Sequence, residues 1–449
     1  MKIHTFHLGG VHPEENKITA EMSTQVAALP KQAIFPLSQH IGAPAKPVVQ
    51  RGDKVKVGTL IAEAGGFVSA PIYSSVSGTV AKIDTSIDAT GYRKPVIIIN
   101  VEGDEWEETI DRTEQLEKLS NHPELTSEEI VERIKVAGVT GMGGAGFPTF
   151  IKLCPPPSAK AECVIINGVE CEPYITSDYR LMMEHSDEII EGVRLLMKAA
   201  KVDKAYIGIE DNKPKAIQLF EEKVADIQGI EVVPLAKKYP QGGEKQLVDA
   251  VIHRQVPAPP AIPVNVGAIV QNVGTAFAVY QAVMKHKPLF ERYTTVTGKK
   301  IKNPGNFLVR MGTPFSQLID ACGGLPDEDN KVLAGGPMMG KAVMSLDVPV
   351  CKGTNSITVL SGFDAHRKNI QSCIRCGKCI DACPMGLEPY LLATLSSLKE
   401  YERLEQEDVT SCISCGSCQF TCPSHRPILD NILQGKGAVM SIIKSRQKK

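Results

Sequence analysis

Cys373-Ile-Arg-Cys376-Gly-Lys-Cys379-Ile-Asp-Ala-Cys383-Pro384 is repeated as Cys412-Ile-Ser-Cys415-Gly-Ser-Cys418-Gln-Phe-Thr-Cys422-Pro423. Two such runs are typical of a domain that holds two 4Fe-4S clusters, in which the fourth cysteine of each run binds the cluster of the other run. A structural zinc site is the simpler alternative, but zinc normally takes separated cysteine pairs or adds histidine. The pattern therefore predicts two clusters, with the ligand sets Cys373, Cys376, Cys379 and Cys422 for one and Cys412, Cys415, Cys418 and Cys383 for the other.

The segment between the two runs carries apolar residues at helical spacing. They are Leu387, Tyr390, Leu391, Leu395 and Leu398. We interpret them as the packing face of a helix that bridges the two cluster loops. Glycines inside the runs, Gly377 and Gly416, allow each loop to curl around a cluster with its amides directed at the sulfurs.

The composition narrows the class of protein. At 449 residues the chain is long enough for about three domains. Its formal net charge of -1 argues against a general nucleic-acid binder. No apolar run reaches the roughly 20 residues that span a bilayer, and the N-terminus lacks the apolar core of a signal peptide. Eight of the 13 cysteines lie in the two runs and the other five are scattered. We therefore expect no disulfides, and we expect the chain to be located in the cytoplasm.

The C-terminal segment is basic. After Asp430 it contains lysines and arginines but no acidic residue. We expect residues 428–449 to form a solvated, frayed tail. Contact with an anionic membrane face or with an acidic partner is the alternative.

The N-terminal third predicts a small all-β domain. Between Gln50 and Val101 short apolar runs alternate with glycine turns. The phrase beginning at Gly52, with the later Val76-Ser-Gly-Thr-Val, resembles the barrel-sandwich hybrid of lipoyl and biotinyl carriers. Those domains present a modified lysine on a hairpin tip, whereas the comparable turn here, Ala64-Gly-Gly-Phe67, has none. We therefore expect a docking domain and not a swinging arm, followed by a charged linker with a short helix.

A glycine-rich loop lies in the middle of the chain. A helix is predicted from a capping Ser or Thr to Gly138, and Gly141-Met-Gly-Gly-Ala-Gly-Phe-Pro-Thr149 follows, with Pro148 placed to start a further helix through Lys152. The loop lacks the Gly-Lys-Ser/Thr of a P-loop, and it follows a helix where a Rossmann fingerprint would follow a strand. Because it has few side chains, a flat ring or a phosphate could approach its backbone. We interpret it as a candidate nucleotide site.

Buried strands then alternate with helices. The expected strands are 162–167, 205–210 and 230–234, and helices are expected to begin near Ser177 and Pro214. This rhythm predicts a parallel sheet whose ligands lie beyond the carboxyl ends of its strands. The first such end, Asn167-Gly-Val-Glu-Cys-Glu-Pro173, carries amide and carboxylate groups suited to hydrogen bonding with a nucleotide. Acids that cap the next helix would explain Asp178 but not the two glutamates.

Three later stretches complete the chain before the cysteine runs. Tyr239 to Leu247 is a turn that opens a helix, and the prolines from Pro257 to Pro263 form a stiff connector. Asn272 to Thr275 precedes a helix and could offer amides and a hydroxyl to a phosphate. From 293 to 360 β-propensity and turns return, which predicts a compact β-rich domain.

The glycine loop and the loop after Asn167 resemble the flavin- and NADH-binding subunit of respiratory complex I, which has the same G-x-G-G-A-G-F-P-T-x-x-K and Asn-x-x-Glu-x-Glu-Pro motifs. Residues 239–247 and 271–275 resemble two further motifs of that subunit, in the same order. Taken whole, from its histidine-proline arm to its twin cluster runs, the chain resembles the C subunit of the Rnf complex. It departs from the complex I subunit in having a ferredoxin-like C-terminal domain. It also has Val169 at a position where an acidic residue is common, and Gly274 at a position where glutamate is common.

The resemblance implies a set of cofactor-binding residues. Gly141, Gly143, Gly144 and Gly146 would line the flavin and nicotinamide site, and Phe147 would stack on a base. Lys152, Asn272 and Thr275 would hold the FMN phosphate or polar edges. Asn167 and Glu170 would lie near the isoalloxazine ring, and Glu172 and Glu244 would contact NAD(H).

The resemblance also implies a multidomain fold of α/β and β parts. The expected domains are an N-terminal arm (1–29), a barrel-sandwich hybrid (30–105), a linker (106–124), a Rossmann-like FMN/NAD domain of the complex I type (125–260), a β-grasp soluble-ligand-binding domain (261–360), a ferredoxin-like domain with two 4Fe-4S clusters (361–427) and the basic tail (428–449).

The implied function is that of a subunit of a membrane-bound ferredoxin:NAD+ oxidoreductase that pumps sodium ions or protons. Hydride would pass between NAD(H) and FMN and single electrons through the clusters, with no catalytic side chain. The chain would sit peripherally on the cytoplasmic face of the membrane against other Rnf subunits, and ferredoxin would reach it only through another subunit. Two alternatives are a soluble cobalamin reductase, in which the β-hybrid segment follows the clusters instead of preceding the flavin domain, and a non-catalytic cluster-bearing adaptor.

Overall fold

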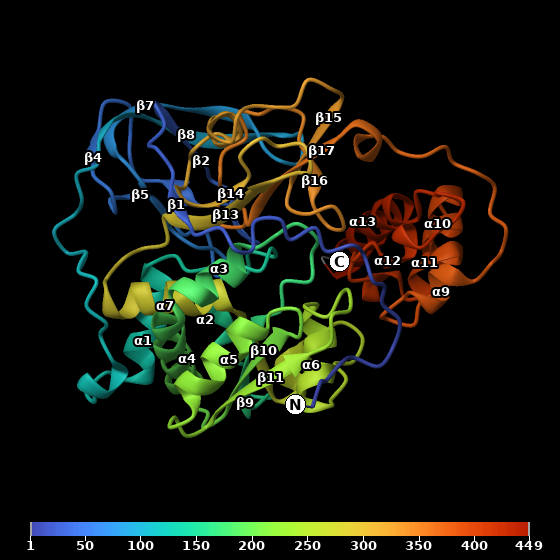
Figure 1. The fold of residues 1–449 in the computed structure, drawn as a ribbon, viewed down its shortest axis with the longest axis horizontal. Helices are drawn as coiled ribbons and strands as arrows, with labels where there is room; N and C mark the ends of the chain where they lie inside the picture. Colours follow the sequence, from blue (N-terminus) through green and yellow to red (C-terminus); the bar gives the residue numbers. More distant parts are fainter. Residues whose placement is uncertain (1, 448–449) are drawn as a thin grey trace.

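The computed structural model of the chain describes residues 2–447. Figure 1 shows a layer of helices around a parallel sheet, drawn in green and yellow, beneath strands from the blue N-terminal and orange later parts of the chain. A third region, the red helices of the C-terminal part, lies to one side. None of the helices in residues 2–447 has the length and apolar character that a membrane span requires.

The central α/β region is built on a four-stranded sheet in the order β11-β10-β9-β12, in which every neighbouring pair is parallel. The predicted parallel sheet is therefore confirmed. Chain order reverses between β9 and β12, so the crevice beyond the carboxyl ends of these two strands is the expected ligand position. The elements are β9 (Cys163–Gly168), β10 (Ala205–Glu210), β11 (Ile230–Leu235), β12 (Ala268–Asn272), α1 (Ser127–Val136), α2 (Thr149–Lys152), α3 (Ser177–Glu184), α4 (Ser186–Ala200), α5 (Pro214–Val224), α6 (Glu244–Ile252), η2 (Pro263–Val266) and α7 (Val273–Met284).

Helix α1 begins as the sequence predicts. The Thr126 side chain accepts a hydrogen bond from the Glu129 amide, and the Glu129 carboxylate accepts one from the Thr126 amide. This capping box satisfies two amide donors at the helix start. The helix ends at Val136, and Gly138 then takes a positive φ of 68° to turn the chain toward the glycine loop.

The N-terminal β domain contains two small sheets, of order β2-β8-β7-β4 and β3-β5-β6. Its long strands pair antiparallel over most of their length, and Phe35, Ile97 and Ile99 are fully buried between them. The strands are β2 (Gln32–Pro36), β3 (Lys46–Pro47), β4 (Lys54–Val55), β5 (Leu60–Glu63), β6 (Ile72–Tyr73), β7 (Ser77–Ile87) and β8 (Arg93–Gly103), and the following linker contains η1 (Leu119–Asn121).

The second β domain has a six-stranded sheet, of order β1-β14-β13-β17-β15-β16. Its edge strand β1 comes from the N-terminal arm and pairs parallel with β14. The arm also pairs through His4 with Leu235 and through Val11 with Tyr239, so one short segment joins the edges of two sheets. The elements are β1 (Gln25–Val26), β13 (Glu291–Thr297), β14 (Gly305–Arg310), α8 (Phe315–Ala321), β15 (Asn330–Ala334), β16 (Lys341–Ala342), β17 (Ser356–Ser361) and η3 (Gly362–Ala365).

The C-terminal region is helical and differs from the prediction in two places. Residues 428–447 form the helix α13, with Ile432 and Val439 buried, so the expectation of a frayed tail was wrong. In the bridging helix α10, Leu395 is buried as predicted, but Tyr390 and Leu398 are exposed, because the buried face is centred on Leu392. The elements are α9 (Lys378–Asp381), α10 (Pro389–Leu398), α11 (Tyr401–Gln406), η4 (Val409–Ser411), α12 (Ser417–Phe420) and α13 (Ile428–Gln447).

Candidate functional site

The glycine loop lies at the crevice between β9 and β12. Gly143, Gly144 and Ala145 are exposed, and Gly144 has a φ of 113°, which side-chain-bearing residues rarely adopt. A Cβ atom at Gly143 would lie 3.5 Å from the Asn272 side chain, whereas one at Gly144 would meet no atom within 4 Å. The loop therefore presents bare backbone next to open space, and a planar ring fits such a surface. Gly141 and Phe147 close the base of the loop through a 2.7 Å hydrogen bond from the Gly141 amide to the Phe147 carbonyl.

Two buried groups fix the start of this loop. The Met142 amide donates to Thr275 Oγ1 at 2.9 Å, and Arg292 Nη2 donates to the Met142 carbonyl at 2.5 Å. Burial lowers the pKa of Arg292 to about 10, with Asp178 as its counter-charge. Arg292 belongs to β13 of the second β domain, so that domain helps to hold the loop in place.

Two asparagines connect the strand ends to the loop. Asn272 caps α7 by accepting the Gly274 amide at 2.9 Å, and its Nδ2 donates to Asp178 Oδ2 at 2.7 Å. Asn167 Nδ2 donates to the Gly242 carbonyl at 2.9 Å, in the turn that follows Tyr239. Both side chains thus lie where β9 and β12 end, and the side-chain amide of Asn272 faces Gly143.

Lys152 and Glu244 form an ion pair. Lys152 Nζ lies 2.5 Å from Glu244 Oε1 and 3.1 Å from the Val270 carbonyl. Both side chains are partly exposed. A phosphate bound at Lys152 would compete with Glu244 for the same ammonium group. The structure therefore brings the predicted residues of the glycine loop together with five others: Lys152, Asn167, Glu244, Asn272 and Thr275.

The two glutamates after Asn167 have other partners. Glu170 Oε1 accepts the Asp178 amide at 2.8 Å at the start of α3, so helix capping accounts for this residue, contrary to our argument from the sequence. Burial raises the pKa of Glu170. Lys17 of the N-terminal arm donates to the carbonyls of Glu170, Glu172 and Ile175 at 2.6, 2.8 and 2.6 Å and fixes the path of this loop.

Glu172 points toward the second β domain. Its Oε1 accepts the amides of Met338 and Met339 at 3.2 and 2.7 Å, and burial raises its pKa to about 7. A Cβ atom at Gly336 would lie 2.4 Å from Glu172 Cγ, so glycine is required for this approach. Glu172 thus lies under the turn between β15 and β16 of the second β domain.

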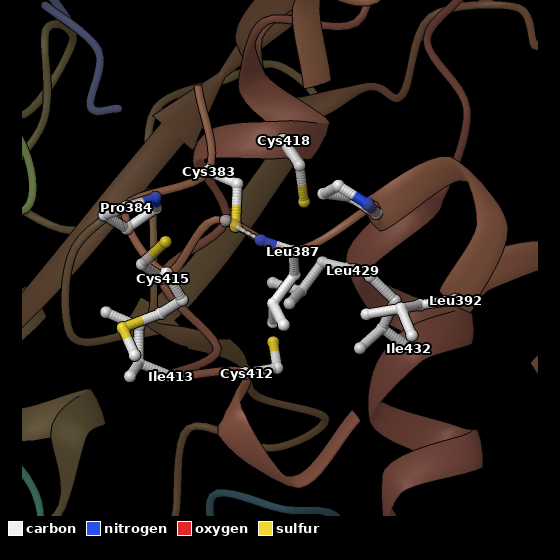
Figure 2. Close-up of a pocket in the computed structure, with 13 residues that line it drawn as sticks. Cys383, Pro384, Leu387, Leu392, Cys412, Ile413, Cys415, Cys418, Leu429 and Ile432 are labelled. Atoms are coloured by element: carbon white, nitrogen blue, oxygen red, sulfur yellow. Dashed lines mark hydrogen bonds between the residues drawn. The ribbon is translucent and has the colours of Figure 1, made fainter. Parts of the chain in front are cut away.

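Four cysteines line one pocket in the C-terminal region. Cys383, Cys412, Cys415 and Cys418 surround it together with apolar side chains that include Leu387, Leu392 and Ile432, and its empty volume is about 350 Å³. Figure 2 shows the four sulfurs directed toward the same space. This set combines three cysteines of the second run with the last cysteine of the first, as the sequence predicts.

The surroundings of these thiols fit an iron-sulfur cluster. Burial raises the pKa of Cys412, Cys415 and Cys418, and a coordinated iron removes the thiol proton outright. Backbone amides approach the sulfurs, with Leu387 N 3.4 Å from Cys383 Sγ and Ser414 N 3.4 Å from Cys412 Sγ. Among residues 2–447 no three His, Cys, Asp or Glu side chains converge closely enough for a single metal ion.

The other four cysteines lie nearer the surface. Burial raises the pKa of Cys379, and the nearby thiols of Cys422 and Cys376 raise it further. Cys373 and Cys376 are exposed. Two hydrogen bonds join the ends of the two runs, from the Gln371 amide to the Ser424 carbonyl and from Ser424 Oγ to the Ser372 carbonyl, both at 2.9 Å.

The pocket with four cysteines adjoins the α/β region. Tyr239, only 2% exposed, donates its hydroxyl to the Cys415 carbonyl at 2.7 Å. Gln246 Nε2 donates to the Pro384 carbonyl at 3.2 Å, and the Gly10 amide of the arm donates to the Ala382 carbonyl at 3.0 Å. Tyr239 begins the turn that also contains Gly242 and Glu244, so six consecutive residues connect the cysteine pocket to the glycine-loop site.

Sequence reasoning missed several residues that shape this site. Lys17, Arg292 and Tyr239 act through contacts with segments more than 100 residues away. No local pattern marks Lys17 or Arg292, and the turn motif that contains Tyr239 does not predict its contact with Cys415. Lys352 is a fourth case, because its fully buried ammonium group donates to the carbonyls of Pro71 and Gly138 at 2.7 Å each. The following residue, Gly353, lies beside the Gly144 carbonyl of the glycine loop.

Fold and site together define a class: flavin-domain iron-sulfur proteins of electron transfer. Sequence-family comparison agrees, with matches to the RnfC barrel sandwich hybrid domain at 4–104, the Nuo51 FMN-binding domain at 134–281, the SLBB domain at 293–342 and a 4Fe-4S dicluster domain at 372–426. The expected multidomain fold is therefore confirmed, and the chain contains an FMN-binding domain and a 4Fe-4S domain.

Curated relatives give the family. The chain is 46% identical over 402 residues to the C subunit of the proton-translocating ferredoxin:NAD(+) oxidoreductase complex of Clostridium ljungdahlii, covering 89% of this chain and 86% of the relative. It is 40% identical over 401 residues to the C subunit of the Na(+)-translocating complex of Acetobacterium woodii, covering 89% of each. The chain belongs to the Rnf family of C subunits of ion-translocating ferredoxin:NAD+ oxidoreductase complexes, and the predicted family is confirmed.

A solved structure shares the fold. The NAD+-reducing [NiFe]-hydrogenase in its air-oxidized state aligns with a TM-score of 0.50 at 20% identity, over 70% of this chain and 62% of the hydrogenase chain. At this identity the likeness concerns the fold alone.

Proposed function

We propose that this chain is the NAD(H)- and FMN-binding iron-sulfur subunit of an ion-translocating ferredoxin:NAD+ oxidoreductase. The observation that carries the proposal is the continuous connection from the glycine-loop site, through residues 239–244, to the pocket of Cys383, Cys412, Cys415 and Cys418. When bound, FMN converts the two-electron exchange of NAD(H) into single electrons that clusters can carry. The protein supplies position and electrostatics, and no side chain acts as nucleophile, acid or base.

The proposed residue roles follow the geometry. The backbone of the glycine loop (Gly141, Gly143, Gly144 and Gly146) would support the flavin, with Phe147 beside a base. Lys152, Asn272 and Thr275 would hold phosphate or polar edges, and Asn167 would lie near the ring. Glu244 and Glu172 remain proposed NAD(H) contacts, and each would first have to leave its present partner, Lys152 or the Met338 and Met339 amides. Glu170 would act on the flavin only through helix α3, whose start it caps.

Two clusters are proposed, one for each set of four cysteines. The set around the pocket adjoins Tyr239, so it would exchange electrons with the flavin, and the set containing Cys373 and Cys376 would exchange them with the exterior. We propose the domain divisions predicted from the sequence with two changes: the α/β domain extends beyond residue 260 through α7, because β12 pairs with β9, and residues 428–447 join the ferredoxin-like part as α13. Attachment to the cytoplasmic face of the membrane through other subunits belongs to the same proposal.

Cofactor analysis of the anaerobically purified chain tests this function. We expect about one FMN and about eight irons per chain, and bleaching of the visible spectrum on addition of NADH. A full iron content with no flavin and no response to NADH, even after reconstitution with FMN, would leave a one-electron adaptor. A cobalamin reductase would instead reduce cob(II)alamin with NADH. The β-hybrid domain precedes the flavin domain here, which favours the Rnf-type function over that alternative.

A further inference from the structure

The first cysteine run lies on an exposed surface. Every residue from 366 to 376 is exposed, and the segment from β17 to α9 arches around the outer side of the C-terminal helices, away from the α/β region (Figure 1). Two of the proposed cluster ligands, Cys373 and Cys376, therefore lie at the surface. We call the side chains around them the outer-cluster face, and define it as Lys368, Ile370, Ile374, Arg375, Lys378 and Ile380.

The outer-cluster face has an apolar part. Ile370 and Ile374 are 61% and 67% exposed, and Ile380 on α9 is 38% exposed. Helix α12 packs beside α9 and adds Phe420, which is 52% exposed. Large apolar side chains gathered on one exposed surface mark an interaction site more often than a free surface, because their burial stabilises a complex.

The charges on this face are predominantly basic. Lys368, Arg375 and Lys378 are exposed or partly exposed, and among residues 2–447 none of them forms an ion pair, whereas the neighbouring Arg367 is paired with Asp430. Asp381, exposed at the end of α9, is the one acidic residue within 366–381. An apolar centre with a basic rim is complementary to an apolar partner surface with an acidic rim.

We propose that the outer-cluster face binds an acidic subunit of the same complex, which carries its own one-electron centre and passes electrons to or from the cluster of Cys373, Cys376, Cys379 and Cys422. The proposal rests on the proposed function for the direction of the electron path, but the docking itself does not depend on flavin chemistry. The exposed isoleucines favour a permanent neighbour over a soluble carrier, because permanent interfaces are more hydrophobic, whereas transient electron-transfer encounters bury little area. Each transfer oxidises one centre by one electron and reduces the other by one electron, and no bond is made or broken.

Cross-linking of the intact complex tests the docking directly. A zero-length carbodiimide joins lysines to carboxylates in contact, and mass spectrometry identifies the pairs. We expect Lys368 and Lys378 to link to aspartates or glutamates of another cofactor-bearing subunit. Lys399 and Lys444, at the distal ends of α10 and α13, serve as the comparison. Links to that subunit from the comparison lysines alone would overturn the proposal.

Charge reversal provides the second test. In the purified complex the variant K368E/K378E should release the acidic subunit at a salt concentration severalfold lower than the wild type does, and the matched variant K399E/K444E should behave as the wild type. Equal retention in all three complexes would refute the acidic partner. Iron content, FMN content and NADH bleaching of the isolated chain are measured on the same variants. Absence of NADH bleaching already in the wild-type chain, together with the expected salt-dependent release, would count against the proposed function and leave the docking surface standing.

Discussion

Replacement of Tyr239 by phenylalanine should loosen the contact between the cysteine pocket and the α/β region. The change removes one hydroxyl, which donates to the Cys415 carbonyl at 2.7 Å, and keeps the buried ring. A buried carbonyl left without a partner costs about 1–3 kcal/mol. Docking of the C-terminal helices should weaken by that amount, which corresponds to a roughly 5- to 150-fold increase in the undocked population.

Hydrogen exchange measures this opening. The amides of Gly10, Val11 and Tyr239 are hydrogen-bonded at or beside the contact, to the carbonyls of Ala382, Tyr239 and Val11. In Tyr239→Phe these amides should exchange roughly 5- to 150-fold faster, while amides of the central sheet keep their rates. Stopped-flow reduction by NADH should show unchanged flavin bleaching and slower bleaching of the iron-sulfur absorption.

A matched control removes a hydroxyl elsewhere. Tyr206 lies half-buried on β10, and in residues 2–447 its hydroxyl has no hydrogen-bond partner, so Tyr206→Phe should change neither exchange nor reduction. If exchange at Gly10, Val11 and Tyr239 is the same in Tyr239→Phe, in this control and in the wild type, the hydroxyl does not hold the two regions together. The argument for electron passage through residues 239–244 would then lose its structural support.

Three further predictions concern the cofactor sites and the domain contacts. Cys415→Ser should lower the iron content from about eight to about four per chain, while serine at the exposed Cys154 leaves it unchanged; equal iron in both would exclude Cys415 as a ligand. Gly144→Ala places a side chain on a residue with a φ of 113°. The backbone strain should cost about 1–3 kcal/mol and weaken FMN retention about tenfold or more. The control is Gly437→Ala in α13, where the added Cβ atom would meet no atom within 4 Å, and this variant should retain FMN normally. Burial lowers the pKa of Lys352 from 10.5 to about 7. Between these two pH values the lysine is protonated in the unfolded chain and mostly neutral in the folded chain, so the free energy of unfolding should rise with pH across that window. In thermal unfolding the stability of the wild type relative to Lys352→Met should improve by about 2–3 kcal/mol from about pH 7.5 to about pH 9.5, and a difference independent of pH would show that Lys352 titrates normally.

Local patterns in the sequence predicted the parallel sheet, the capped helix at Thr126 and the β domains, because each depends on residues close together in the chain. The spacing of the cysteines likewise predicted that Cys383 would meet Cys412, Cys415 and Cys418, since a shared cluster motif specifies that crossing. Their role as ligands stays a prediction, as do the flavin contacts.

Contacts between distant segments could not be predicted in this way. In the sequence Lys17 has no feature that distinguishes it from a surface lysine. In the structure its ammonium group donates to three carbonyls of the loop after Asn167. Glu172 matches a nucleotide-site motif, yet its carboxylate faces the Met338 and Met339 amides of another domain. The basic residues after Asp430 suggested a frayed end, but apolar residues at helical spacing, Ile432 and Val439 among them, bury one face of α13.

The N-terminal arm has a consequence for synthesis of the chain. Residues 4–26 are made well before their partners, which are Leu235, Tyr239, Phe307, Leu308 and Ala382. Until then the arm has no sheet edge to join, and unpaired strand segments promote association between chains. The two sheets can take up the arm once residue 308 is available, but the contact between Gly10 and Ala382 forms only when the first cysteine run has been made, so the last step of arm docking and the loading of iron fall in the same late stage of maturation.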